Sequence, residues 1–166
     1  MAFDSDWFIL AAMIDGGASP LHFRLAEALH AEATALAAQA RDYFDGVGRA
    51  DRDALRPIER VAFSCESLKI TTRLMHVLAW LLNRRALDGG EIGREAPNSS
   101  PRLGPAPETD TAVLAAVPDA ARALIAASAD LHRRVTRLDA ARQRDTPMPG
   151  PARALRDRLA LVPKAG

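Results

Sequence analysis

The sequence is poor in aromatic residues and in β-branched residues. Aromatic side chains make up 5% of its 166 residues, and valine, isoleucine and threonine together number 20. Because these residue types are the usual material of strands, the shortage argues against a sandwich, a barrel or a parallel sheet. Alanine (34) and leucine (20), which enter helices at little cost, are abundant instead. The composition therefore predicts a single all-α domain.

Cysteine and long apolar runs are also scarce. The one cysteine, Cys65, excludes an intramolecular disulfide and a zinc site made of several thiolates. The longest central apolar run, Val77–Leu82, is far shorter than the roughly 18–20 residues of a membrane-spanning helix. The apolar run Trp7–Met13 follows Asp4 and Asp6, where a signal peptide would carry positive charge. We therefore expect a cytoplasmic protein with no membrane segment.

No charge sign is in large excess, since 22 basic residues face 21 acidic ones. The distribution is uneven: residues 1–50 carry 3 basic and 7 acidic side chains, and residues 118–166 carry 10 and 5. Domains that bind nucleic acid strongly are usually more basic, and no helix-turn-helix spacing is present. A DNA-binding helical regulator is therefore the alternative rather than the leading interpretation, and we expect no nucleic acid partner.

Motifs that carry chemistry are missing as well. The only Glu-x-x-His pair is Glu27 with His30, whereas di-iron bundles need two such pairs and two further glutamates. Gly46-Val47-Gly48 follows a predicted helix and lacks the third glycine of a dinucleotide-binding loop. Cys65 lies on an apolar helix face, which predicts a buried, inert thiol. We expect no catalytic residue, no metal and no cofactor.

Three long helices are predicted, over residues 19–45, 53–88 and 111–144, and they form an antiparallel bundle. The first begins with Ser19 as N-cap and ends at Asp45-Gly46-Val47-Gly48, where glycine would supply the left-handed conformation typical of helix ends. The second starts at Pro57 or as early as Asp53, and the third is broken at Pro118.

The remaining segments are predicted to lie outside the helices. Residues 1–18 are a leader, and residues 89–110 are a flexible loop or linker with four prolines and four glycines. Residues 146–166 are a flexible basic tail, with four basic residues and one acidic residue. The predicted bundle thus spans residues 19–145.

Apolar stripes run along all three helices. In the first helix the stripe is Leu21, Leu25, Leu29, Leu36 and Tyr43, and in the third it is Ala121, Leu124, Ser128, Leu131, Val135, Leu138 and Arg142. The second helix has a heptad stripe with spacings of three and four, which we predict to face the bundle: Ile58, Val61, Cys65, Leu68, Thr72, Met75, Ala79, Leu82 and Ala86.

The second helix also carries a second stripe, which makes it apolar on more than one side. This second stripe consists of Ile70, Leu74, Val77, Leu78 and Leu81, and the residues predicted to make the contact are Ile70, Leu74, Val77 and Leu81 together with Trp80. Since a helix that is apolar all round must be covered all round, the second stripe predicts a homodimer interface. Packing of Trp80 within one chain is the alternative for that residue.

Three sequence segments resemble a known family. Tyr43–Arg49 (YFDGVGR), Ser64–His76 (SCESLKITTRLMH) and Ala79–Glu91 (AWLLNRRALDGGE) resemble the RcdA family, the regulator of CtrA degradation. The family pattern has an aromatic-Asp-Gly-x-Gly-Arg turn, a Glu-Ser-x-x-x-Thr-Thr-Arg-Leu-Met core and a Trp-Leu-Leu-x-x-Arg-Ala ending. The close resemblance covers residues 43–91, whereas the leader, the linker and the tail depart from the pattern.

The resemblance implies a non-enzymatic adaptor for the ClpXP protease in bacterial cell-cycle control, built as a three-helix homodimer and recruited transiently to a cell pole. Its implied partners are the protease machinery, a response-regulator-type co-adaptor and the proteolysis substrates. A general protein-interaction scaffold is a further alternative. The resemblance points to these residues: Glu66, Arg73, Arg84 and Arg85 as candidate partner contacts, and Asp45, Gly46, Gly48 and Arg49 as a structural turn, with Arg49 fixing it through Asp45.

Overall fold

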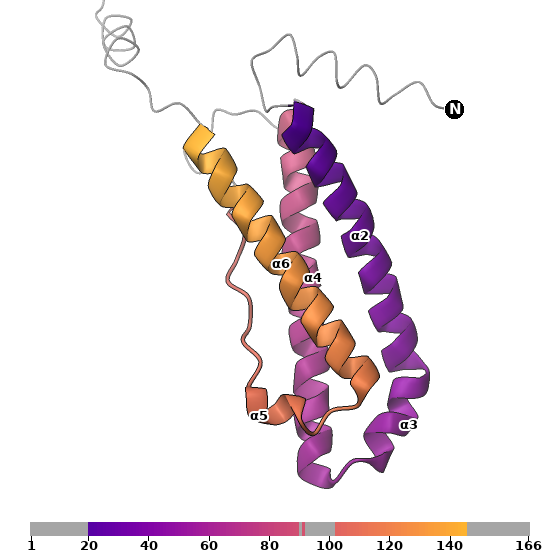
Figure 1. Cartoon of the computed structure of the whole chain (residues 1–166). Helices are drawn as coiled ribbons and strands as arrows, with labels where there is room; N and C mark the ends of the chain where they lie inside the picture. Colours follow the sequence, from indigo (N-terminus) through magenta and orange to yellow (C-terminus); the bar gives the residue numbers. More distant parts are fainter. Residues whose placement is uncertain (1–19, 90, 92–101, 146–166) are drawn as a thin grey trace, which may run out of the picture.

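Three long helices form one bundle in the computed structural model, which describes residues 20–89, 91 and 102–145. They are α2 (Pro20–Asp45), α4 (Pro57–Asp88) and α6 (Asp119–Asp145). Two short helices, α3 (Val47–Ala54) and α5 (Thr111–Leu114), lie at the same end of the bundle (Figure 1). The predicted all-α bundle is thus confirmed. The predicted leader (1–18), the Ser19 cap and the predicted tail (146–166) lie outside the described residues.

The direction of α6 differs from the prediction of an antiparallel bundle. Arg73 of α4 bonds to Ser128 of α6, and Asp88 further along α4 bonds to Arg142 further along α6, so these two helices run parallel. Only α2 is antiparallel to both (Figure 1). Residues 102–110 run back along the outside of the bundle before α6 begins, so that α6 starts at the same end as α4 (Figure 1).

The core confirms most of the stripes predicted for α2 and α6. In α2, Leu29, Ala33, Leu36 and Ala40 are buried, whereas Leu21 and Leu25 near the start of the helix are exposed. All seven residues of the α6 stripe are buried, and Ile125 and Val117 join them: Ala121, Leu124, Ser128, Leu131, Val135, Leu138 and Arg142. Spacing alone was sufficient for α6, which presents a single apolar side, and for α2 from Leu29 onward.

The turn after α2 contains an additional helix, α3, where the sequence predicted only a turn. Gly46 has a φ of −106°, so the predicted left-handed conformation is wrong. Glycine is needed there for space, because a Cβ on Gly46 would lie 2.8 Å from the carbonyl oxygen of Asp42. The predicted contact between Arg49 and Asp45 is present as a 3.8 Å ion pair, but both side chains are exposed. Such a pair contributes little to stability.

Tyr43 fastens α3 to the rest of the bundle. Its hydroxyl donates a hydrogen bond of 2.7 Å to Oδ2 of Asp51, and its ring packs against Phe44 and Phe63 at centroid distances of 5.0 and 6.4 Å. Burial raises the pKa of Tyr43, and the hydrogen bond to the Asp51 carboxylate raises it further. This cluster fixes the path by which the chain passes from α2 to α4.

Replacing Gly48 by alanine is expected to lower the free energy of unfolding by about 1–3 kcal/mol. A Cβ at this buried position would lie 2.8 Å from the carbonyl oxygen of Tyr43, a backbone atom that cannot rotate away. Helix propensity alone would favour alanine by about 1 kcal/mol, so the sign of the change separates the two effects. Urea unfolding measures it, with the exposed Ala50→Gly as control, and a stabilised Gly48→Ala would contradict the close contact.

Candidate partner-binding surfaces

Residues 102–110, here called the strap, lie extended along α4 and α6 and are held by hydrogen bonds. The backbone N–H of Leu103 donates to Asp139, and His132 Nε2 donates to the carbonyl oxygen of Gly104 at 2.9 Å. The carbonyl oxygen of Pro107 accepts from Nε and Nη2 of Arg73, at 3.1 and 2.6 Å. The expectation of a flexible linker therefore needs correction here, because these residues form an anchored strap; residues 92–101 of the same segment lie outside the described residues.

Glu66 and Arg73, predicted as candidate partner contacts, form a buried polar cluster with the strap instead. Each is 2% exposed. The hydroxyl of Thr109 accepts a hydrogen bond from Arg73 Nη2 at 2.8 Å and donates one to Glu66 Oε2 at 2.7 Å. Ser128 accepts from Arg73 Nη1, and Lys69 binds Glu66 Oε1. The hydroxyl of Thr109 thus bridges the two charged side chains. The prediction that Glu66 and Arg73 contact a partner is therefore wrong, because both are buried.

His132 holds the strap at its other end. Burial lowers the pKa of His132, and the nearby His76 and Arg73 lower it further, against the opposing effect of the bond to Gly104. His76 lies on the other side of this contact, since a Cβ on Gly104 would meet its ring at 3.1 Å. Glycine at position 104 therefore allows the strap to pass directly over two imidazole rings.

Acidification is expected to destabilise the protein through His132. Because its pKa is lower in the folded state, the unfolded chain binds more protons as the pH falls below about 6.5. The contribution of His132 to the free energy of unfolding is therefore fully present above that pH, and it is lost as the pH decreases further. Urea unfolding at about pH 7.5 and about pH 5.5 measures the difference, and His132→Gln, which can still donate to Gly104, should reduce it. An unchanged pH dependence in that variant would contradict this role.

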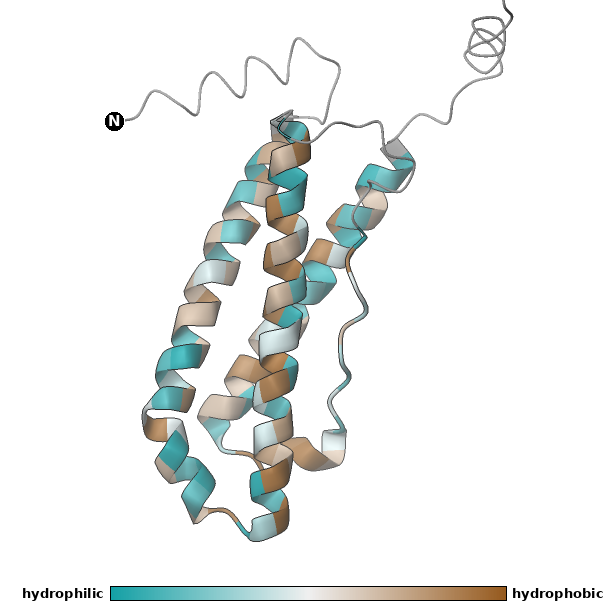
Figure 2. Ribbon diagram, turned by 180° about the vertical axis from the view of Figure 1, so that it is seen from behind, coloured by the Kyte–Doolittle hydropathy of each residue, from teal (hydrophilic) through white to brown (hydrophobic). Residues whose placement is uncertain are grey.

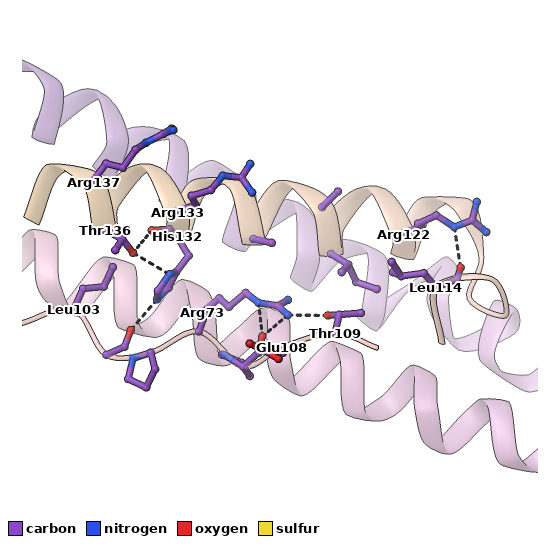
Figure 3. A pocket seen from close by; sticks show the side chains of 17 residues that line it. Arg73, Leu103, Glu108, Thr109, Leu114, Arg122, His132, Arg133, Thr136 and Arg137 are labelled. Atoms are coloured by element: carbon purple, nitrogen blue, oxygen red, sulfur yellow. Dashed lines mark hydrogen bonds between the residues drawn. The ribbon is translucent and has the colours of Figure 1, made fainter. Parts of the chain in front are cut away.

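A groove of about 770 Å³ lies between the strap and α6 (Figure 3). Its lining is mostly apolar, with Leu103, Ala106, Leu114, Ile125, Ala126 and Ala129 along it. Arg122, Arg133 and Arg137 of α6 line its edge, and Glu108 is the only carboxylate among the described residues that line it. The sequence carries no signal for this groove, because a segment rich in proline and glycine is typical of an unstructured connection.

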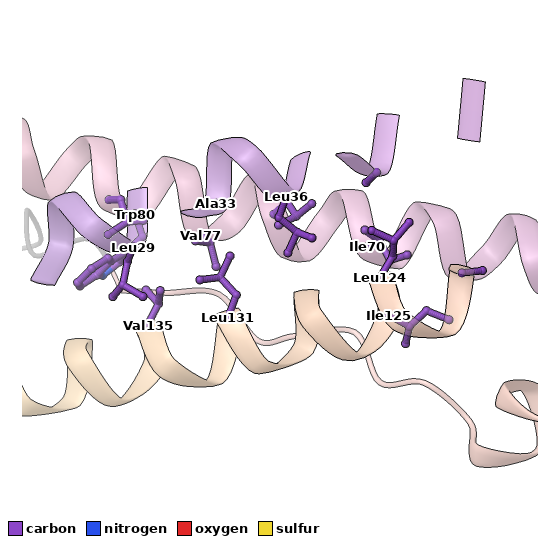
Figure 4. Packing of buried hydrophobic residues seen from close by; sticks show 14 of the residues in the cluster. Leu29, Ala33, Leu36, Ile70, Val77, Trp80, Leu124, Ile125, Leu131 and Val135 are labelled. Atoms are coloured by element: carbon purple, nitrogen blue, oxygen red, sulfur yellow. The ribbon is translucent and has the colours of Figure 1, made fainter. Parts of the chain in front are cut away.

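The second stripe of α4, predicted as a dimer interface, is the part of α4 that packs inside the bundle. Ile70, Leu74, Val77, Trp80 and Leu81 are all between 0% and 4% exposed. Figure 4 shows Val77 and Trp80 among Leu29, Leu131 and Val135 of the other two helices. The predicted interface is therefore wrong for these five residues, and the alternative for Trp80, packing within one chain, is correct.

The heptad stripe, predicted to face the bundle, lies on the outside of α4. Leu68 is 67% exposed and Met75 63%, and Ile58, Val61 and Leu82 are also exposed. Cys65 is exposed as well, so the prediction of a buried thiol is wrong. Figure 2 shows apolar bands recurring along α4 on the side turned to the viewer. Because large apolar patches mark interaction sites, this stripe is the strongest candidate for a protein interface.

Several arginines at the surface of α4 and α6 form ion pairs, and one of them is the predicted partner contact Arg85. Arg85, in the last turn of α4, forms a 3.8 Å ion pair with Glu27, and Arg84 is partly buried. In α6, Arg133 pairs with Asp130, and Arg134 pairs with both Asp130 and Glu32. The charges of Arg85, Arg133 and Arg134 are thus balanced by carboxylates, whereas Arg137 of α6 forms no ion pair within the described residues.

Neither a cluster of metal-binding side chains nor a membrane-spanning helix occurs in the part of the chain that the structure describes. It contains no group of three or more histidine, cysteine, aspartate or glutamate side chains that could hold a metal ion. None of its helices is both long enough and apolar enough to cross a bilayer.

Comparisons with known proteins give a consistent result. Residues 18–165 match a family described as "Protein of unknown function (DUF1465)". Among solved structures, the chain is similar to RcdA from Caulobacter crescentus CB15, with 31% sequence identity and a TM-score of 0.56. The similarity covers 69% of this chain and 88% of that one. Comparison with curated protein sequences finds no match.

Proposed function

The chain belongs to the RcdA family, and on that premise we propose that it is a non-enzymatic adaptor of regulated proteolysis. In this role it links substrate proteins to the ClpXP protease in the bacterial cytoplasm during the cell cycle, together with a response-regulator-type co-adaptor. The family membership carries the proposal. The bundle supports it, because a helix that leaves a long apolar stripe outside its own core is suited to binding other proteins.

A second copy of the chain is the proposed partner of the heptad stripe. From Ile58 to Leu82 the stripe runs over 25 residues, or about 36 Å of helix. Its spacing of three and four is the pattern by which one helix packs against another. None of its nine residues is charged, so two copies can meet along it without like charges opposing each other. A two-fold dimer uses the same surface on both partners, which this stripe allows.

The adaptor function is tested by measuring proteolysis directly. The chain is used to capture proteins from its native cytoplasm, and each captured protein is then incubated with purified ClpXP, with and without the full chain. We expect faster degradation of at least one captured protein when the chain is present. The variant Leu68→Asp, which keeps the core intact, serves as the control for dependence on the dimer. Degradation rates that do not change for any captured protein would contradict the adaptor function.

A further inference from the structure

The groove between the strap and α6 has the dimensions of a peptide-binding site. On α6 it extends from Arg122 to Arg137, which corresponds to about 22 Å of helix. An extended chain of about seven residues covers that length. Ala126, Thr136 and Glu108 at its edge are exposed, so the groove opens to solvent along the surface.

The groove is formed before any ligand binds. The small side chains of Ala126 and Ala129 leave room next to α6, and the Pro105-Ala106-Pro107 segment of the strap forms the opposite wall. The strap itself is fixed by the hydrogen bonds from Arg73 and His132. A preformed groove saves the entropy that ordering a loop would otherwise cost on binding.

The charge at the edge of the groove is positive at one end. Arg133 and Arg137, four residues apart on α6, project from the same side of the helix (Figure 3). Arg133 bonds to Asp130 through Nη2, and Arg137 forms no ion pair within the described residues. Arg122 at the other end is already engaged, because it donates to the carbonyl oxygens of Leu114 and Val117. A ligand carboxylate is therefore best accommodated near Arg133 and Arg137.

We propose that this groove docks an acidic, apolar linear segment of a partner protein. The apolar side chains of the segment lie between the strap and α6, where burial of their surface supplies affinity. A carboxylate of the segment meets Arg133 and Arg137, and this charged pairing fixes the direction in which the segment binds. The inference rests on the proposed adaptor function and names the chemistry of a partner that such an adaptor would recognise.

Peptide selection on the full chain tests the proposal. Random peptides of about twelve residues are displayed and selected for binding, and the best one is labelled and titrated by fluorescence anisotropy. We expect selected peptides to combine apolar residues with aspartate or glutamate. Filling the groove with Ala126→Phe, or reversing its charge with Arg133→Glu and Arg137→Glu together, should each weaken binding at least about tenfold.

Two matched controls lie on α6 outside the groove. Ala127→Phe and Arg144→Glu change the same residue types at exposed positions, and they should alter binding by less than about twofold. Thermal unfolding shows that each variant folds, and if Ala126→Phe does not, the charge-reversal variant decides. Selection of no peptide, equal binding by groove and control variants, or displacement of the peptide by a short DNA duplex would each overturn the proposal. A chain that accelerates proteolysis but binds no such peptide would overturn the groove proposal alone.

Discussion

Replacing Arg73 by alanine is expected to lower the free energy of unfolding by about 3–5 kcal/mol. The guanidinium group is almost fully buried and donates to Pro107, Thr109 and Ser128. Its removal would leave the carbonyl oxygen of Pro107 without this donor, and it would leave Glu66 buried with less compensating charge. A buried acceptor that loses its donor costs about 1–3 kcal/mol by itself, and a buried carboxylate costs more.

Urea unfolding of Arg73→Ala measures this loss, and two further variants define its origin. Arg85→Ala removes an exposed arginine of the same helix and should cost less than about 1 kcal/mol. Arg73→Lys keeps the charge but loses the planar group that reaches several acceptors at once, so it should recover only part of the stability. Equal stability of Arg73→Ala and Arg85→Ala would show that the polar cluster does not hold the strap.

Two leucines of α4 are expected to respond in opposite ways to the same substitution. Leu74→Asp places a carboxylate inside the core, which removes packing and buries an unpaired charge. A loss of more than about 4 kcal/mol is expected, which is enough to unfold many domains of this size. Leu68 lies on the exposed heptad stripe. Leu68→Asp should therefore change the free energy of unfolding by no more than about 0.5 kcal/mol, while the proposed dimer dissociates.

Circular dichroism and light scattering together distinguish the two outcomes. We expect Leu74→Asp to lose its helical circular dichroism signal. Leu68→Asp should keep that signal, while light scattering gives half the mass of the unaltered protein. If the unaltered chain is already a monomer at micromolar concentration, the proposal of a homodimer is wrong. If Leu68→Asp unfolds the chain, the assignment of the heptad stripe to the surface is wrong.

The sequence predicted α2 and α6 well but interchanged the two sides of α4, and the reason lies in two charged residues. The buried side of α4 also follows a spacing of three and four, through Phe63, Glu66, Ile70, Arg73 and Val77. Glu66 and Arg73 interrupt it, so the uninterrupted heptad stripe looked like the core. Charged residues are buried when their hydrogen bonds are satisfied. Here most of the bonds join α4 to Pro107 and Thr109 on the strap and to Ser128 on α6, which periodicity within α4 cannot indicate.

Part of the candidate site could have been found from the sequence. Ser128 and Arg142 occupy positions of the α6 stripe, and polar residues at core positions indicate a buried polar network. The residues that form hydrogen bonds with this buried network could not be predicted from the sequence. Arg73 bonds across 34 to 55 positions of sequence, and the composition of the strap, rich in proline and glycine, is typical of both a free linker and an anchored segment. Only the three-dimensional path of the strap distinguishes them.

The parallel course of α4 and α6 also determines the order in which we expect the chain to fold. The α2–α4 pair can close progressively from its turn, because Tyr43 meets Phe63 near the turn before Glu27 meets Arg85 far from it. No such progression exists for α6, whose bonds to α4 span 54 or 55 residues at both places along the helix. Closing so long a loop costs conformational entropy before the contacts between α4 and α6 can offset that cost, so these contacts form late. We therefore expect the α2–α4 hairpin to form first and α6 with its strap to join last. The same elements should be the first to detach. Hydrogen exchange would then show that the amides of α6 lose protection before those of α2 and α4.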